Sequence, residues 1–328
     1  MSSERLMSKI DVTEALESLL GKSVLKTQDL NKGQIIALIQ STIDNKTTNN
    51  LFDSQPVKDK ILIPLFDKPS LRTYAGTIAA WLRMGGNYIP LTPSKSREPI
   101  RHAARVMGGY ADALVARVSS FEDLCEYDKH FLDRNKVKIP VISGMTDLDH
   151  ILQFLADSTT ALEKHPDRNL ADLKIAYLGD YNNVARSTFI GYSTLGVNIR
   201  IASPTLSNVT EEDREYGNLH NEGNFLFTAD PYEAVKDADI VMTDVWVSMG
   251  EENDDNSLKK LIHLPYQVNS GLMKSASPNA FVQHCMPVHP GEELTEVEYL
   301  RNEDEIIGQS HNRMFSTASL LAAVYKNK

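Results

Sequence analysis

The chain has 328 residues and a formal net charge of −10, with 41% hydrophobic and 24% charged residues. This composition is typical of a globular protein with full cores, and its acidic balance argues against a general nucleic-acid binder while leaving room for a local cationic pocket. The two cysteines, Cys125 and Cys285, have no metal-ligand spacing and fit a reducing compartment, so we expect a cytoplasmic protein. Because no signal-peptide pattern and no apolar run of about 18 residues occur, we expect no membrane segment.

Short apolar runs alternate with helical patterns along the chain. Most of these runs are continuously apolar, which is typical of parallel strands covered on both faces. Strands are predicted at residues 60–66, 112–118, 137–143, 173–179, 197–203, 224–228, 238–244 and 279–285. Apolar residues at helical spacing lie between them, so the sequence predicts an α/β protein with two doubly wound parallel-sheet domains. The two domains are expected at 1–147 and 148–309, and the tail from 310 to 328 is expected to be a helix.

Ligands of such sheets bind at the carboxyl ends of the strands, so polar residues just after each strand are the candidates for a site. The first predicted strand is followed by Ser70, Arg72 and Thr73, directly before a helical run. A hydroxyl, a guanidinium and the free amides of a helix start together form an anion cradle. The alternative is an ordinary helix cap with surface charges, because capping hydroxyls are common.

Three more polar residues lie at strand ends or helix starts. Arg117 ends a predicted strand, and arginine is rarely buried without a partner. His150 and Gln153 share one face of a helix that is predicted to start near residue 148, after a capping pattern at 146–149. A histidine in a first helical turn is biased toward neutrality and can donate to an oxygen. For each of these residues the alternative is a solvent-exposed side chain that belongs to no site.

Three later strand ends carry further candidates. The stretch 177–187 has a Gly-Asp turn but lacks G-x-G-x-x-G and a following acidic residue, so a dinucleotide site is not expected. Asn182 and Asn183 instead offer amides to a carboxylate or a backbone. Asp244 and Ser248 place an acceptor and a hydroxyl beside a glycine turn, and Cys285 ends a strand before a proline turn. A buried structural thiol is the alternative for Cys285.

In order and spacing, these motifs resemble those of the transcarbamoylase family, and its ornithine branch most closely. The resemblance covers roughly residues 30–325. It rests on Ser70-Leu71-Arg72-Thr73-Tyr74, His150-Ile151-Leu152-Gln153, the loop from Asp244 through Ser248-Met249-Gly250, His284-Cys285-Met286-Pro287, and Asn312-Arg313.

The resemblance implies a carbamoyl phosphate-binding domain at 1–147, to which the tail helix at 310–328 returns, and an ornithine-binding domain at 148–309. It implies carbamoyl transfer from carbamoyl phosphate to L-ornithine, with no cofactor and no metal, in a homotrimer or a multiple of trimers whose sites lie between neighbours. The implied catalytic residues are Arg117, His150, Gln153, Cys285 and Arg313. The implied carbamoyl phosphate ligands are Ser70, Leu71, Arg72, Thr73, Arg117, His150, Gln153, Cys285, Met286 and Arg313. The implied ornithine ligands are Asn183, Asp244, Ser248 and Met249.

Some positions depart from the family pattern. Leu71 replaces a threonine and Tyr74 an arginine, and the segment between Leu91 and Val106 is shorter than in ornithine enzymes. That segment normally lends a residue to the neighbouring subunit's site, and Lys95 and Arg97 are the candidates for it. A lost hydrogen bond to a charged group is worth about 1.5–3 kcal/mol, so Leu71 could weaken phosphate binding. Two alternatives therefore stay open: another amine acceptor, such as putrescine or a modified ornithine, and a catalytically silent paralogue that binds ligand.

Overall fold

The computed structural model describes residues 11–68, 70–91, 98–221, 224–247 and 256–326. By internal packing the chain divides into two compact units. Unit 1 runs to Thr159 and resumes at His311, and unit 2 spans Thr160–Ser310. The first division falls inside helix α7 (Ile151–Lys164), whereas the sequence places it just before that helix. A continuous helix offers no linker composition from which the change of unit could be predicted.

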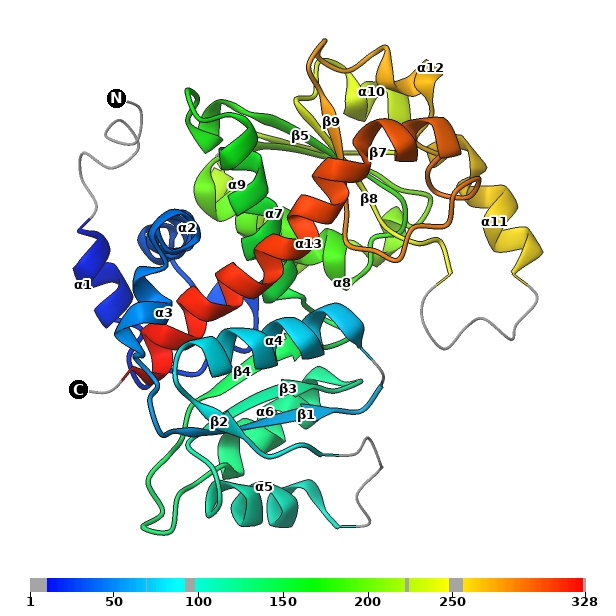
Figure 1. Cartoon of the computed structure of the whole chain (residues 1–328). Helices are drawn as coiled ribbons and strands as arrows, with labels where there is room; N and C mark the ends of the chain where they lie inside the picture. The colour runs from blue at the N-terminus through cyan, green and yellow to red at the C-terminus, as the bar shows by residue number, and fades with distance from the viewer. Residues whose placement is uncertain (1–10, 69, 92–97, 222–223, 248–255, 327–328) are drawn as a thin grey trace. The chain divides into compact units, whose positions relative to one another are not determined.

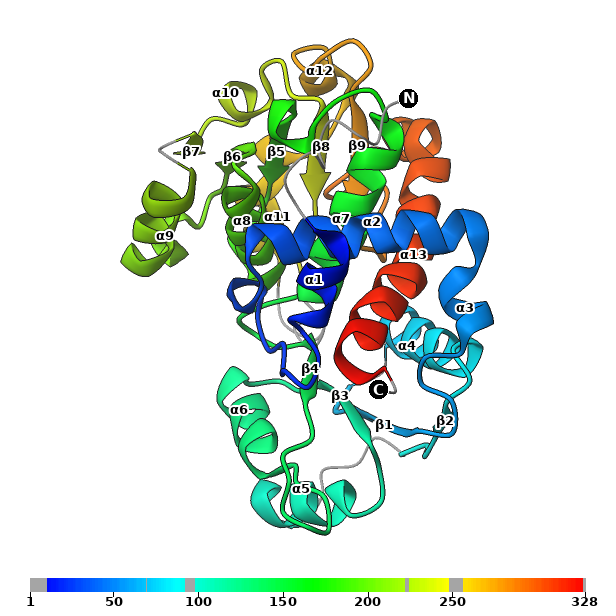
Figure 2. The ribbon, with the colours of Figure 1, turned by 90° about the vertical axis from the view of Figure 1, so that its left-hand side faces the viewer.

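Unit 1 is built on a parallel sheet in the order β2-β1-β3-β4. Its strands are β1 (Ile61–Phe66), β2 (Asn87–Tyr88), β3 (Ala113–Arg117) and β4 (Val141–Met145). Its helices are α1 (Val12–Glu17), η1 (Thr27–Asp29), α2 (Lys32–Thr48), α3 (Asn50–Ser54), α4 (Leu71–Arg83), α5 (Ile100–Gly108), α6 (Phe121–His130) and the start of α7. Helices α5 and α6 cover one face of the sheet, and α4 with the last turns of α13 covers the other (Figures 1 and 2).

Two strands of unit 1 differ from the prediction. Strand β2 was not expected, because two residues carry too little pattern to detect. It pairs with β1 only at Ile61 and Leu62. Pro64 of β1 therefore has no partner in β2, and its missing N–H removes no hydrogen bond between these two strands. Strand β4 starts at Val141 rather than 137, because Lys138 instead forms an isolated antiparallel bridge with Leu132.

Unit 2 is built on a second parallel sheet, in the order β7-β6-β5-β8-β9. Its strands are β5 (Lys174–Leu178), β6 (Asn198–Ala202), β7 (Phe225–Thr228), β8 (Ile240–Thr243) and β9 (Phe281–His284). Its helices are η2 (Leu170–Asp172), α8 (Asn183–Leu195), η3 (Leu206–Asn208), α9 (Glu211–Asn221), α10 (Pro231–Val235), α11 (Ser257–His263), η4 (Leu264–Tyr266), α12 (Ser270–Met273) and the start of α13. Each strand lies inside its predicted range, so the predicted α/β class with two parallel sheets is confirmed.

Each unit has its own apolar core. In unit 1 the indole of Trp81 on α4 is fully buried and meets the ring of Tyr325 edge-on, at 5.7 Å between centroids. In unit 2 one core cluster lies between the sheet, α10 and α12, with Val241, Val282 and Leu272 at 0–1% exposure. Strands β3, β8 and β9 are buried at every residue, as the continuous apolar pattern predicts, whereas the edge strand β7 is half-buried throughout.

The last helix, α13 (Glu296–Tyr325), is longer than the predicted tail helix and starts in unit 2. Its part from His311 onward belongs to unit 1, where the Gly21 amide donates to the Val324 carbonyl at 3.0 Å. The expectation that the chain's last helix returns to the first domain is therefore confirmed. No described helix has the length and apolarity needed to cross a membrane.

Candidate active site

In unit 1, the strand order reverses between β1 and β3, and ligands of open parallel sheets bind outside the carboxyl ends of strands at such a switch point. Strand β1 ends at Phe66, just before Ser70, and β3 ends at Arg117. Ser70 occupies the cap position of α4, but its side chain accepts no capping bond there. Its Oγ instead lies 2.9 Å from an Nη of Arg117, which donates to it. The hydroxyl is thus committed to the cluster of polar groups at the strand ends.

A buried hydrogen-bonded network joins two arginines of unit 1, Arg117 and Arg313. Arg313 on α13 donates to Thr73 Oγ1 at 2.7 Å and also to the Gln153 side-chain oxygen. Arg117 reaches the same Thr73 hydroxyl at 3.4 Å, and Gln153 donates to Asp157 at 2.6 Å. Thr73, Arg117, Gln153 and Arg313 are each at most 7% exposed. Two guanidiniums held in a dry site by neutral oxygens produce a strong positive potential at a fixed place.

His150 lies in this positive field and is 5% exposed. Burial lowers its pKa well below the usual 6.5, and the charges of Arg313, Arg117 and Arg72 lower it further. The imidazole is therefore neutral at ordinary pH, and it can offer a hydrogen bond without carrying a charge. This agrees with the neutral histidine that its place at a helix start predicts. The preceding Asp149 is also buried and accepts from the Thr27 hydroxyl at 2.9 Å, which fixes the start of α7.

The two departures from the family motif have different structural consequences. Leu71 is 78% exposed, so its side chain points to solvent and only its backbone amide is available to the cradle. Tyr74 turns toward the strand instead, and its ring meets that of Phe66 edge-on at 5.2 Å. The ring of Tyr74 thus adds to the packing between α4 and β1.

The switch point of unit 2 lies between β5 and β8, and it brings Asn182 beside Asp244. Asn182 caps α8: its Oδ1 accepts from the amides of Val184 and Ala185 at 3.0 Å. Its Nδ2 donates to Asp244 Oδ2 at 2.9 Å. One side chain thus fixes both the start of α8 and the orientation of the carboxylate.

Cys285 completes this second cluster. Its thiol donates to Asp244 Oδ1 at 2.9 Å, and the same oxygen accepts from the Val245 amide at 2.8 Å. Behind it, the Met286 amide donates to His284 Nδ1 at 2.7 Å, while His284 Nε2 faces Glu293 at 3.1 Å. Because Nδ1 accepts, His284 carries its proton on Nε2 and donates to the carboxylate. This buried pair fixes the turn that carries Cys285 and Met286.

The predicted site residues thus fall into two described sets. Unit 1 gathers Ser70, Thr73, Arg117, His150, Gln153 and Arg313, with Arg72 close enough to lower the pKa of His150. Unit 2 gathers Asp244 and Cys285, with Met286 next in sequence to Cys285. Asn183 begins α8, directly after the Asn182 that bonds to Asp244. The predicted Ser248, Met249, Lys95 and Arg97 lie outside the described residues.

Sequence reasoning did not assign the roles of Asn182 and the His284–Glu293 pair. For Asn182 a signal existed, since an asparagine directly before a helical run is a typical cap, but its second bond to Asp244 spans 62 positions. For His284 and Glu293, nine residues apart, no local pattern indicates that the two side chains face each other.

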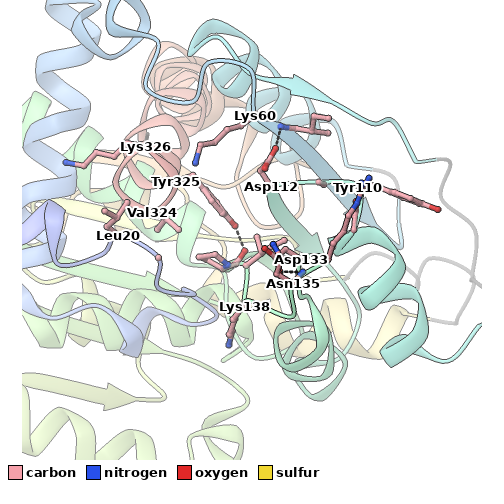
Figure 3. A pocket seen from close by; sticks show the side chains of 18 residues that line it. Leu20, Lys60, Tyr110, Asp112, Asp133, Asn135, Lys138, Val324, Tyr325 and Lys326 are labelled. Carbon is pink, nitrogen blue, oxygen red and sulfur yellow. Dashed lines mark hydrogen bonds between the residues drawn. The ribbon is translucent and has the colours of Figure 1, made fainter. Parts of the chain in front are cut away.

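A cavity of about 660 Å³ in unit 1 is separate from these clusters (Figure 3). It is lined by the beginning of β1 at Lys60 and Ile61, by Asp112 just before β3, and by Tyr325 of α13. It therefore opens at the amino-terminal ends of the strands, the edge opposite Ser70 and Arg117. It shares no lining residue with the predicted site.

One group of potential metal ligands occurs among the described residues. His289, Glu292 and Glu293 bring one ligand atom each within 4.8 Å of one another. Glu292 is paired with Lys260 at 2.6 Å, and one oxygen of Glu293 faces His284. None of these residues belongs to the predicted site, and the expectation that the reaction uses no metal stays a prediction.

Taken together, the fold and these clusters define a two-unit parallel-sheet protein with a buried cluster of guanidiniums and hydroxyls in one unit and a carboxylate-thiol cluster in the other. Residues 22–163 match the family model described as the carbamoyl-P binding domain of aspartate/ornithine carbamoyltransferase, and residues 171–324 match its Asp/Orn binding domain. The chain belongs to the aspartate/ornithine carbamoyltransferase family. The family predicted from the motifs is therefore confirmed.

Curated relatives and solved structures point the same way. The chain is 36% identical to an ornithine carbamoyltransferase of Nostoc punctiforme over 321 residues, covering 94% of this chain and 99% of the relative. It is 34% identical to that of Thermococcus kodakarensis, covering 94% and 97%. The solved ornithine carbamoyltransferase of Pyrococcus furiosus superposes with a TM-score of 0.85 at 32% identity, covering 94% of this chain and 98% of that chain.

Proposed function

We propose that this chain transfers the carbamoyl group of carbamoyl phosphate to the δ-amine of L-ornithine, forming citrulline and phosphate. The observation that carries the donor half is the pair of buried guanidiniums, Arg117 and Arg313, held around Thr73 beside a neutral His150. An anionic donor with a polarisable carbonyl suits this field. The ornithine half is supported by the names of the relatives and by the carboxylate of Asp244.

The donor's phosphate is assigned to the start of α4. Ser70, Arg72, Thr73 and the backbone amide of Leu71 supply hydroxyl, guanidinium and amide donors at one helix N-terminus. As the bond from carbon to the phosphate oxygen breaks, negative charge grows on the phosphate, and these donors stabilise it.

The carbonyl oxygen is assigned to Arg117, His150 and Arg313. When the amine nitrogen attacks the carbonyl carbon, this oxygen gains negative charge in the tetrahedral state, and preorganised donors in a dry site lower the barrier. The neutral His150 contributes a hydrogen bond rather than a proton. Gln153 holds Arg313 in place through its side-chain oxygen and is anchored in turn by Asp157.

The acceptor is assigned to unit 2. Asp244 and Ser248 are assigned to the α-ammonium of ornithine, Asn183 to its α-carboxylate, and Met249 is the fourth proposed ornithine ligand. Cys285 and Met286 are assigned to the place where the δ-amine meets the carbamoyl group. The δ-amine must lose its proton before it attacks, and nearby cations with a dry environment favour that loss.

We further propose a homotrimer or a multiple of trimers, in which Lys95 or Arg97 reaches the neighbouring subunit's cradle. The support is chemical: a phosphate dianion has more oxygens than Ser70, Arg72 and Thr73 satisfy, and Leu71 supplies no hydroxyl. The cytoplasmic location also stays a proposal, supported by Cys125 and Cys285, neither of which forms a disulfide.

The decisive assay measures product formation from carbamoyl phosphate with a panel of amines: ornithine, N-acetylornithine, putrescine and aspartate. We expect ornithine to give the highest kcat/KM, with citrulline as product. A higher value for putrescine or N-acetylornithine would reassign the acceptor. No product with any amine, together with measurable binding of carbamoyl phosphate, would identify a silent paralogue.

A further inference from the structure

His263, the last residue of α11, makes two short polar contacts and is 2% exposed. Its Nε2 lies 2.7 Å from Asp180 Oδ1, in the turn between β5 and α8. Its Nδ1 lies 2.7 Å from the Lys259 carbonyl oxygen, one turn back on α11. The Lys259 ammonium adds a third contact, 3.3 Å from the other oxygen of Asp180.

Both atoms that face the ring are acceptors. A carbonyl oxygen has no proton to give, and an ionised carboxylate has none either. Burial by itself raises the pKa of Asp180, but its hydrogen bond with His263 and the Lys259 ammonium 3.3 Å away outweigh burial and hold that pKa below its ordinary value. Asp180 is therefore ionised. A neutral imidazole has only one N–H and would leave one of these short contacts without a proton, so the geometry requires protons on both ring nitrogens.

The ring also links the two segments that carry Asn182 and Asp244, and we call these contacts of His263, Asp180, Asn182, Asp244 and Trp246 the circuit. Asp180 lies two residues before Asn182, and Trp246 lies two residues after Asp244. The rings of Trp246 and His263 lie 5.9 Å apart, and Asn182 donates to Asp244 at 2.9 Å. His263 therefore contacts both segments that present the Asn182–Asp244 pair.

We propose that His263 is a positioning residue of the acceptor site, a doubly protonated imidazole that sets the distance between the Asp180 turn and the segment after β8. It touches no reacting group. It acts through Asp180 on Asn182 and through Trp246 on Asp244, and so sets the affinity for the amino-acid acceptor while leaving the donor cradle of unit 1 unchanged. The inference about affinity rests on the proposed function, whereas the protonation of the ring does not.

The first test is spectroscopic and needs no activity. In protein labelled with ¹⁵N-histidine, long-range ¹H–¹⁵N correlation distinguishes protonated from unprotonated ring nitrogens, and the His263 signals are those lost in His263→Gln. We expect both ring nitrogens of His263 to show the chemical shifts of a protonated imidazole. In Asp180→Asn, we expect one of the two nitrogens to show the shift of an unprotonated nitrogen. A single unprotonated nitrogen in the unsubstituted protein would overturn the inference.

The second test is kinetic. We expect His263→Gln to raise the ornithine KM by about 10-fold or more, and to change the carbamoyl phosphate KM less than ~2-fold. Asp180→Asn should have a similar effect, and the double variant should be no worse than either single one, because the two residues form one unit. His220→Gln is the matched control, since His220 is exposed on α9 of the same unit and outside the circuit.

The outcomes separate cleanly. Equal effects on both substrates, additive effects of the two substitutions, or an unchanged ornithine KM would each overturn the positioning role. Far-UV circular dichroism checks that each variant is folded. If even the unsubstituted chain forms no citrulline, the proposed function fails while the spectroscopic result still decides the state of His263.

Discussion

Some single side chains in this protein combine a structural role with a role in the candidate site. Asn182 caps α8 with its oxygen and orients Asp244 with its nitrogen. Ser70 has the place of a cap but gives its oxygen to Arg117. In each case the local backbone needs a small polar residue, and a partner far along the chain determines what that residue does.

His150 should make the stability of unit 1 depend on pH. Its pKa in the folded chain lies well below 6.5, whereas in the unfolded chain it returns to about 6.5. The unfolded chain therefore binds the proton first as the pH falls. The contribution of His150 to the free energy of unfolding is complete above about pH 6.5. Below that pH the contribution falls by up to about 1.4 kcal/mol per pH unit.

His150→Asn removes this titration, so we expect the variant to lose less stability than the parent between pH 6.5 and 5. The chain has two tryptophans, one in each unit, so a Trp246→Phe background leaves Trp81 to report on unit 1 alone in urea unfolding. His102→Asn, at an exposed histidine of the same unit, is the control. Parallel pH profiles for His150→Asn and its parent would contradict the prediction.

Asp244→Asn should act on the acceptor. The substitution keeps the shape but removes the charge that pairs with an α-ammonium, and it sets an amide where Cys285 or Asn182 now donates. We expect the ornithine KM to rise far more than that of carbamoyl phosphate, measured by citrulline formation. Asp237→Asn, at an exposed position with φ of 56° that asparagine tolerates, should change neither value. Equal effects on both KM values would move Asp244 out of the acceptor site.

At the scale of elements, α13 contributes to both units. Its first part packs on the core of unit 2, where Ile306 is fully buried, and its last part supplies Arg313 and Tyr325 to unit 1. The Tyr325 hydroxyl is buried and donates to the Pro140 carbonyl, just before β4. The end of the helix is therefore fixed to the sheet that carries Arg117.

Tyr325→Phe should destabilise unit 1. The ring contact with Trp81 stays, but the buried Pro140 carbonyl loses its donor, which costs about 1–3 kcal/mol. Urea unfolding followed by Trp81 fluorescence measures the loss, and Tyr232→Phe, at an exposed tyrosine of unit 2, should leave it unchanged. If both variants unfold at the same urea concentration as the parent, the hydroxyl contributes nothing to unit 1.

At the scale of the whole molecule, the question is whether one chain suffices for one site. The described donors of the cradle come from unit 1 of a single chain, and the proposed trimer adds Lys95 or Arg97 from a neighbour. The alternative is that residues 93–98 form a solvated surface turn, as polar stretches with proline usually do.

Mixing two inactive chains separates these alternatives. Arg72→Ala removes a charged contact to the phosphate and should lower kcat/KM by about 100-fold or more. The double variant Lys95→Ala/Arg97→Ala should also be poorly active. If sites are shared, mixed trimers hold some sites with both defects and some with neither, so activity should reappear on subunit exchange. Mixtures that stay at the average of the two parents, or a loop variant that is fully active alone, would exclude the shared site.

The sequence by itself determined the class of fold and the identity of the chemical groups. Continuous apolar runs indicate parallel strands, and the residues just after them are the candidates for a site, because both signals are local in the chain. This is why Ser70, Arg117, Asp244 and Cys285 could be named in advance. The family's motifs added Arg313, which no strand pattern indicates.

Only the tertiary structure decided which groups meet. The bonds of Ser70 with Arg117 and of Arg313 with Thr73 span 47 and 240 positions, and that between His263 and Asp180 spans 83. No periodicity encodes such pairs, because they depend on how whole elements pack. A neutral His150 is expected from its place at a helix start, but the causes that lower its pKa, which are burial and the charges of Arg313, Arg117 and Arg72, come from tertiary packing.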